Sequence, residues 1–425
     1  MTSMQQFLED MFRAAFAAAD PARAVPSHLP EPPAGGRTIV VGAGKAAASM
    51  ARALEGCWRG PLEGVVVTRY GHAVPCSFIE VVEAAHPVPD QAGLDASARI
   101  LRKVQGLGPE DLVICLISGG GSSLLSAPAP GLSLADKQQI NDALLRSGAP
   151  IGDMNIVRKH LSAIKGGRLA AAAAPARVET LIISDVPGDD PAIVASGPTV
   201  ADPSTFAEAR SILQRYNITG PAAAIGVLEQ AEHETPKPGD PRLVRANARV
   251  IASAARSLEA AARMAGDKGY RVVNLGDRIE GEAREVARQH AALVKEIARG
   301  RGEVSPPCVI VSGGETSVTM RGDGRGGRNG EYLLALAIAL EGLGGVYALA
   351  ADTDGIDGSE SNAGAWIGPD TVARARECGV DPDVAIRRND SFTVFEKLES
   401  LVFTGPTLTN VNDFRAILIL DNASC

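Results

Sequence analysis

Leu112-Val-Ile-Cys-Leu-Ile-Ser-Gly-Gly-Gly-Ser-Ser123 is the stretch around which this chain is organised. Its apolar first half is rich in β-branched residues and predicts a buried strand. The three glycines that follow let the backbone turn sharply and leave its N–H groups uncovered by side chains. Such a turn, flanked by serine hydroxyls, is suited to hold phosphate or carboxylate oxygens. A tight turn without a ligand explains the same residues equally well, so the loop alone leaves both interpretations open.

Composition restricts the class of protein and its partners. The 425 residues carry a formal net charge of -8, which argues against binding to nucleic acid or to a membrane surface. The six cysteines contain no C-x-x-C pair, which is typical of reduced thiols in the cytoplasm. The first residues lack a signal-peptide pattern, and no apolar run approaches the roughly 20 residues of a spanning helix. We therefore expect a cytoplasmic protein.

Apolar strand patterns alternate with helical patterns along the whole chain, and this alternation predicts βαβ units with a largely parallel sheet. The Pro-rich segment 233–241 is the best candidate linker. We therefore predict an α/β protein of two domains with an active site in the cleft between them. The first, residues 1–237, is Rossmann-like with a mostly parallel sheet flanked by helices, and the second, residues 238–425, is also α/β.

A second glycine turn follows the first predicted strand. Gly42-Ala-Gly-Lys-Ala-Ala47 fits the dinucleotide pattern G-x-G-x-x-A, and Arg69 after the next strand would suit the 2′-phosphate of NADP. Lys45 stands at a predicted helix start, where the helix dipole opposes a cation. A lysine facing a phosphate explains this position better than a solvated surface lysine does.

Several charged loops offer further sites. Arg158–Arg168 concentrates five basic positions, which could line an anion site or form a solvated helix face. Asp189 and Asp190, after a predicted strand, could hold Mg²⁺ or accept a hydroxyl proton, although Asp is also a common turn former. The glycine-rich loop with Arg325 and Arg328 predicts a movable clamp on phosphate oxygens. A weak echo of the first loop recurs at Ser312-Gly-Gly-Glu-Thr-Ser317.

The ordered set of motifs resembles the glycerate 2-kinases of the MOFRL family, also called class II glycerate kinases. The motifs are GAGKA (42–46), HPVPD (86–90), SGGGSS (118–123), RKHLSAIKGGRLA (158–170), SDVPGDD (184–190), SGPT (196–199), SGGETSV (312–318), GGRN (326–329) and DTDGIDG (352–358). The resemblance spans nearly the whole chain and places a MOFRL region at about residues 306–415. It implies ATP-dependent phosphorylation of D-glycerate to 2-phosphoglycerate, with Mg²⁺, and gives weight to Lys45 and Arg328. Two positions depart from the family pattern: Gly330 where the family has glutamine, and Leu408 where it has a glycine that can adopt positive φ.

Phosphoryl transfer depends on positioning and on charge stabilisation, which suggests a role for each candidate. We assign Lys45 and Arg328 to the transferring phosphoryl group. Asp189, ahead of Asp190, would receive the glycerate hydroxyl proton or hold the metal. Asp189 is the catalytic candidate and Asp190 the metal candidate, and which carboxylate has which role is left open. The candidates for binding substrate or nucleotide are Gly44, Ser118, Gly119, Gly120, Gly121, Ser122, Ser123, Lys165, Glu315, Arg325, Asn329 and Asp354. Whether residues 118–123 hold ATP phosphates or glycerate is left open, as is the choice between monomer and homodimer.

Two other functions fit parts of the sequence. An NAD(P)H-dependent hydroxypyruvate reductase would use the GAGKAA turn and Arg69. A non-catalytic sensor of sugar acids could be built on the same fold. The joint presence of Lys45, Arg328 and the Asp loops favours the kinase over the sensor.

Overall fold

The computed structural model describes residues 3–341 and 343–421, which fall into two compact units. One unit is residues 21–251, and the other joins residues 1–20 to residues 252–425. This division differs from the expected boundary at residue 238. The first helix belongs with the C-terminal unit, and a strand beyond residue 238 completes the first sheet.

The sheet of residues 21–251 has six strands in the order β3-β2-β1-β4-β5-β6. The strands are β1 (Thr38–Ala43), β2 (Glu63–Arg69), β3 (Ile79–Ala84), β4 (Leu112–Ser118), β5 (Arg177–Ser184) and β6 (Ala246–Ser253). The four pairs from β3 to β5 are parallel, which confirms the prediction of a mostly parallel sheet. Strands β1 and β4 are neighbours at the point where the strand order reverses, and ligands bind at such points in open α/β sheets.

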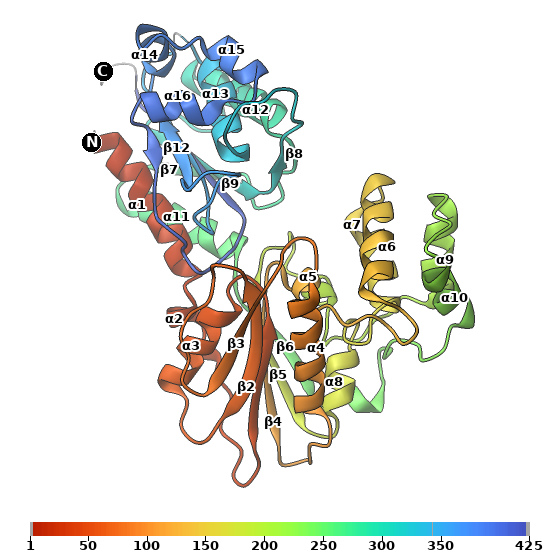
Figure 1. Ribbon diagram of the computed structural model, residues 1–425. Coiled ribbons are helices and arrows are strands. Elements are labelled where there is room, and N and C mark those ends of the chain that lie inside the picture. Colours follow the sequence, from red (N-terminus) through yellow and green to blue (C-terminus); the bar gives the residue numbers. More distant parts are fainter. Residues whose placement is uncertain (1–2, 342, 422–425) are drawn as a thin grey trace. The chain divides into compact units, whose positions relative to one another are not determined.

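Helices of this unit form two groups. Those that belong to the sheet layers are α2 (Pro21–Ala24), α3 (Ala47–Cys57), α4 (Gln91–Val104), α5 (Gly121–Leu124) and α8 (Arg168–Ala173), with short 3-10 turns η1 (Pro26–His28), η2 (Val194–Ser196) and η3 (Pro241–Leu243). A second group stands beside the sheet in Figure 1: α6 (Leu134–Arg146), α7 (Ile151–His160), α9 (Phe206–Arg215) and α10 (Ala222–Gln230). This second group has a core of its own, with Leu144, Val157, Leu213 and Leu228 buried together. The separate core explains how four helices can pack outside the sheet.

The other unit has a six-stranded sheet in the order β13-β12-β11-β14-β9-β7 and a two-stranded pair, β8 with β10. The strands are β7 (Arg271–Asn274), β8 (Gly281–Glu282), β9 (Cys308–Gly314), β10 (Thr316–Ser317), β11 (Val346–Asp352), β12 (Gly364–Ile367), β13 (Leu401–Val402) and β14 (Asp413–Ile419). Only β7 and β9 pair in parallel among the described strands of the large sheet. The expectation of continued parallel βαβ units is therefore wrong here, because β14 returns from the chain end and inserts antiparallel between β9 and β11.

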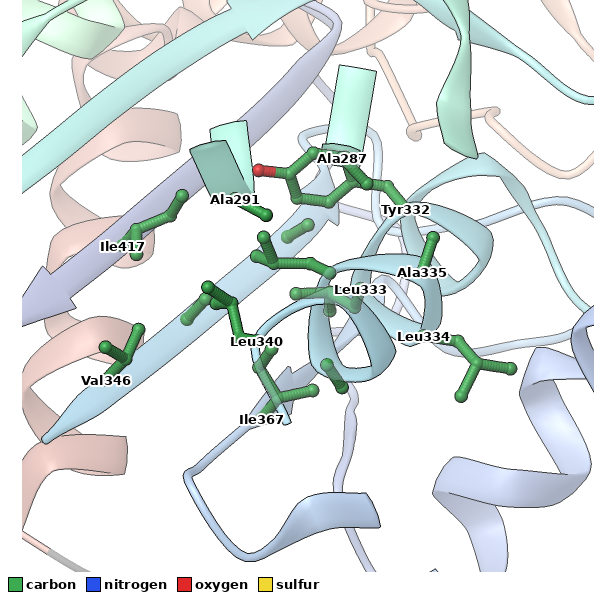
Figure 2. Packing of buried hydrophobic residues seen from close by; sticks show 14 of the residues in the cluster. Ala287, Ala291, Tyr332, Leu333, Leu334, Ala335, Leu340, Val346, Ile367 and Ile417 are labelled. Carbon is green, nitrogen blue, oxygen red and sulfur yellow. The ribbon is translucent and has the colours of Figure 1, made fainter. Parts of the chain in front are cut away.

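Helices cover both faces of this mixed sheet. They are α1 (Ser3–Ala18), α11 (Ala254–Asp267), α12 (Ala283–Ala298), α13 (Arg328–Ala339), α14 (Thr371–Glu377), α15 (Pro382–Arg387) and α16 (Ser391–Lys397). Alternation along β9 feeds two cores, since Val309 and Val311 pack with α1 and α11 while Cys308 and Ile310 pack with α12 and α13. Figure 2 shows the second core around Tyr332 and Leu333 of α13. Helix α13 ends at Ala339.

Candidate active site

The Gly/Ser loop and the GAGKA turn are joined by hydrogen bonds at the ends of β4 and β1. The N–H of Lys45 donates to the carbonyl of Gly119 at 2.8 Å, and the N–H of Ala46 donates to Ser118 Oγ at 2.9 Å. Gly44 has φ +139°, and a Cβ on it would lie 2.1 Å from Ser118 Oγ. Glycine is therefore required at Gly44 by the close approach of the two turns.

Lys45 and the glycine loop come together as the sequence predicted. A Cβ placed on Gly120 would lie 3.4 Å from Lys45 Cγ and 3.0 Å from the ring of His86. Gly120 itself has φ +78°, in the left-handed region, and precedes the single turn of α5. The lysine stem thus runs beside the loop, with the HPVPD segment next to both.

A pocket of about 590 Å³ opens beside this loop. Gly120, Ser122 and Ser123 form part of its lining, and the segment 86–89 forms an apolar wall. Three cations reach the pocket from elsewhere in the unit: Lys137 of α6, Arg158 of α7 and Lys165 from the loop before α8. Lys165 was a predicted binding residue. Lys137 was not predicted as a binding residue, because a lysine inside a polar helical stretch is usually a solvated surface residue.

Burial changes the electrostatics of the three cations. Lys137 is 4% exposed and Lys165 is 1% exposed. Lys165 Nζ donates to the carbonyl of Ser122 at 2.6 Å, whereas Lys137 Nζ has no hydrogen-bond acceptor among the described residues. Burial and the nearby Arg158 lower the pKa of Lys137 to about 8. Burial, followed by repulsion from Lys137 and Arg158, holds the pKa of Lys165 well below its usual range.

The remaining basic residues of 158–168 have structural partners. Lys159 Nζ lies 3.4 Å from Asp202 Oδ1, and His160 Nε2 lies 2.8 Å from Glu234 Oε1. Arg168 donates to the carbonyl of His233. The predicted basic cluster therefore divides: Arg158 and Lys165 line the pocket, and the other three stabilise the loop structure around it. It is not a solvated helix face.

The SDVPGDD segment follows β5 and leads to the SGPT segment, which contacts the glycine loop. Ser122 Oγ and Ser196 Oγ share a hydrogen bond of 2.8 Å. Asp189 has φ +57°, and its Oδ1 is buried without a hydrogen-bond partner among the described residues. Asp190 is exposed, and its Oδ1 accepts the N–H of Ala192 at 2.9 Å, as in a turn. Strained backbone and an unsatisfied carboxylate oxygen single out Asp189 from its neighbour.

In the other unit, Arg328 is held by three carboxylates at the start of α13. Its Nε lies 2.8 Å from Asp413 Oδ1, one terminal nitrogen lies 2.7 Å from Asp352 Oδ2, and the other lies 3.6 Å from Glu315 Oε1. The acids come from the neighbouring strands β14 and β11 and from the residue after β9. Burial disfavours the charge, but the acids outweigh it and raise the pKa of Arg328. The guanidinium is fixed in position.

Asn329 extends this network. Its side-chain nitrogen donates to Asp413 Oδ1 at 2.8 Å, and its N–H donates to Asp357 Oδ1 at 3.0 Å. Burial raises the pKa of Asp357 to about 6. Asp354 is buried in the turn after β11, where its Oδ1 accepts the N–H of Ile356 at 3.0 Å. Of the DTDGIDG acids, Asp352 and Asp357 thus hold the GGRN motif, while Asp354 shapes its own turn.

Arg415 is a buried cation that the sequence interpretation missed. It is 1% exposed, donates to Asp413 Oδ2 at 2.6 Å, and its guanidinium lies 5.3 Å from the ring centroid of Tyr332. A signal was present, because an arginine inside the apolar run Phe414-Arg-Ala-Ile-Leu is unusual unless it has a buried partner. Arg415 and Arg328 therefore share Asp413.

Arg325 does not join Arg328. Its side chain is 49% exposed, lies 4.6 Å from the ring centroid of Phe392, and reaches Glu396 Oε2 at 3.3 Å. A pocket of about 320 Å³ is lined by Thr316, Arg328 and Glu331 among others. The SGGETS echo also differs structurally from SGGGSS, since it continues into strand β10 and not into a helix.

Leu408 adopts φ +61°, which confirms that this position requires the left-handed conformation that glycine favours. At Gly330 a Cβ would lie 2.7 Å from Ser391 Oγ. A larger side chain at Gly330 would therefore have to displace Ser391. Both departures from the family pattern therefore have local structural consequences.

No group of three or more His, Cys, Asp or Glu residues within 3–341 and 343–421 is placed to hold a metal ion. Mg²⁺ that arrives on a nucleotide is bound mainly by phosphate oxygens and needs only one or two protein carboxylates. The free oxygens of Asp189 and Asp190 are compatible with that mode. In the same residues no helix is both long enough and apolar enough to cross a bilayer.

These features define an α/β protein with two glycine turns at a sheet switch point, buried cations around one of them, and a fixed arginine in a second unit. Family models match residues 7–229, as a domain of unknown function (DUF4147), and residues 308–413, as the MOFRL family. The chain belongs to the glycerate 2-kinase family, and it is an enzyme of the glycerate kinase type.

Individual relatives support this membership. The chain is 39% identical to a D-glycerate 2-kinase of Thermotoga maritima over 98% of this chain and 99% of that protein. A crystal structure of a Thermotoga maritima glycerate kinase matches with a TM-score of 0.89 at 38% identity, covering 98% of this chain and all of that one. A protein of Agrobacterium vitis with the name "Putative hydroxypyruvate reductase" is 55% identical over 98% of this chain and 95% of its own length. The kinase prediction is confirmed at the level of the family.

Proposed function

We propose that this enzyme transfers the γ-phosphoryl group of ATP to the 2-hydroxyl of D-glycerate, giving 2-phosphoglycerate and ADP. The observation that carries the proposal is full-length similarity, at 39% identity, to a protein named D-glycerate 2-kinase. The motifs that bear the candidate side chains are present in the sequence. ATP and D-glycerate are the proposed substrates.

Lys45 and Arg328 are the proposed cations on the transferring phosphoryl group. Phosphoryl transfer is catalysed largely by fixed positive charge, and Arg328 is fixed by Asp413, Asp352 and Glu315. Lys45 is anchored through its backbone, since its N–H and the next one are both bound to the glycine loop. These hydrogen bonds fix the backbone from which the lysine side chain extends.

Asp189 is the proposed acceptor of the glycerate hydroxyl proton. Its Oδ1 is buried without a partner in the described part of the chain, so its hydrogen-bonding capacity is unused within the protein. Asp190 is the proposed carboxylate for Mg²⁺, which would neutralise phosphate charge when bound with ATP. Asp189→Asn should lower kcat, while Asp190→Asn should shift the Mg²⁺ dependence of activity.

Product identification by phosphorus NMR tests the reaction itself. The purified chain with D-glycerate and Mg-ATP should give 2-phosphoglycerate. Formation of 3-phosphoglycerate would refute the regiochemistry, and absence of ADP formation would refute the kinase assignment.

A hydroxypyruvate reductase is the second candidate, favoured by the names of the two 55%-identical relatives. It would place NADPH on the GAGKAA turn. The N–H groups of Lys45 and Ala46 are, however, already donated within the protein, to Gly119 and Ser118, and are not available to a pyrophosphate. Gly44 is likewise explained by its approach to Ser118. Loss of NADPH absorbance with hydroxypyruvate, measured against ADP formation with glycerate, separates the two activities.

A further inference from the structure

The pocket beside the glycine loop contains cations that its own protein surroundings do not balance. Lys137, Arg158 and Lys165 line it, in a chain whose net charge is -8. The carboxylate in the lining is Asp142, which is exposed. It pairs at 2.9 Å with Arg146, a residue that does not line the pocket. Lys137 Nζ, in a side chain more than nine-tenths buried, has no acceptor in residues 3–341 and 343–421. A buried ammonium without an acceptor is costly, and such groups persist where a ligand supplies the missing partner.

We propose that this pocket binds the phosphate tail of the nucleotide, with Lys137 as a phosphate ligand and segment 86–89 as the wall for the base. This inference rests on the proposed kinase function. It assigns the pocket beside the glycine loop to ATP and not to glycerate.

Charge favours a polyphosphate over a carboxylate. Glycerate carries one negative charge and would compensate one of three mutually repelling cations, whereas a triphosphate tail can compensate all three. Repulsion among the three is evident in Lys165, whose pKa is lowered by Lys137 and Arg158 in addition to burial. A polyanion would offset that repulsion and favour the charged form of both lysines.

Size and shape favour the same ligand. A pocket of about 590 Å³ suits a ligand of nucleotide dimensions, and a three-carbon acid would fill a small part of it. Pro87, Val88 and Leu145 supply apolar surface at the wall and rim. Gln138 of α6 donates to the carbonyl of Pro89 at 2.7 Å, so the wall and the helix that carries Lys137 are tied together. The site is therefore largely preformed.

Equilibrium binding to the full chain tests the assignment without any turnover. Wild type, Lys137→Met and Lys103→Met are titrated separately with a non-hydrolysable ATP analogue, with inorganic tripolyphosphate and with D-glycerate. Met keeps the length of the lysine stem but removes its charge, and Lys103 is the matched control because it is partly exposed and pairs with Glu63 outside the pocket.

We expect Lys137→Met to lower the affinity for the analogue and for tripolyphosphate by about tenfold or more. The affinity for D-glycerate should be unchanged. We also expect tripolyphosphate to compete with the analogue. If Lys137→Met bound D-glycerate more weakly and the analogue with unchanged affinity, the assignment would be overturned in favour of a carboxylate site. If the affinities for all three ligands were unchanged, it would be overturned in favour of a structural lysine.

A second variant guards against a folding defect in the first. Leu145 is 61% exposed at the pocket rim, so Leu145→Asp adds a negative charge without disturbing the core. This variant should bind the analogue more weakly while its circular dichroism spectrum matches that of the wild type. A wild-type affinity for the analogue would contradict binding of the nucleotide in this pocket. Failure of the kinase reaction would be seen independently, as analogue binding without ADP formation.

Discussion

Lys137→Met should make the ligand-free protein more stable. Lys137 is 4% exposed, and its pKa is about 8 in the folded chain against 10.5 for an ordinary lysine. A difference of about 2.5 pKa units corresponds to about 3 kcal/mol by which the buried charge opposes folding at pH 7. Met removes that charge and keeps the packing of the stem, so the free energy of unfolding should rise by up to about 3 kcal/mol.

The pH dependence gives the sign of the effect. Below pH 8 the lysine is charged in both folded and unfolded chains, and the full cost is present. Between pH 8 and 10.5 the folded chain holds fewer protons than the unfolded chain, so wild-type stability rises with pH relative to the variant. At pH 9.5 the advantage of Lys137→Met should have fallen to about 1 kcal/mol.

Tryptophan fluorescence isolates the unit concerned. The chain has two tryptophans, Trp58 in the unit of residues 21–251 and Trp366 in the other. In a Trp366→Phe background, urea unfolding followed by Trp58 at pH 7 and pH 9.5 therefore reports on the unit that contains Lys137. Lys103→Met is the control and should change stability by no more than about 1 kcal/mol, in the opposite direction, at either pH. A variant less stable than wild type at pH 7, or a gap that does not depend on pH, would refute the reasoning.

Three further outcomes are expected. Lys45→Met should lower kcat by about a hundredfold or more while circular dichroism is unchanged, and near-normal turnover would remove Lys45 from the mechanism. Arg328→Met should lower the free energy of unfolding of its unit by about 3 kcal/mol, measured by calorimetry, because two nearly fully buried carboxylates lose a partner. Arg325→Met should lower it by less than about 1 kcal/mol, because the ion pairs of Arg325 are exposed. Equal losses of stability in the two variants would contradict this difference. Leu408→Gly should raise stability by about 1 kcal/mol by relieving φ +61°, and Leu408→Ala, which keeps a Cβ, should not; a similar gain in both would point to side-chain packing as the cause.

Local pattern was sufficient for much of the architecture. The apolar runs before GAGKA and SGGGSS are buried parallel strands, and the glycines after them sit in turns that only glycine fits. At Leu408 the family motif has a glycine, which can adopt positive φ, and Leu408 has φ +61°. Such features depend on a few adjacent residues, and a single sequence contains them.

Pairing between strands that are distant in the sequence could not be predicted from the sequence. Nothing in residues 413–419 indicates that they insert antiparallel between β9 and β11, because the neighbours of a strand are distant from it in the sequence. The placement of α1 with the C-terminal unit is similar, since its apolar face fits any core and only the tertiary structure selects one.

The charged residues divide in the same way. The sequence by itself determined the family, the two glycine turns and the candidates Lys45 and Arg328, because these lie in short motifs whose chemistry is local. Only the tertiary structure decided that Lys137 joins Lys165 in one pocket and that Arg415 shares Asp413 with Arg328. Whether a lysine is solvated or buried without an acceptor depends on side chains distant in the sequence, and folding alone brings those side chains to it.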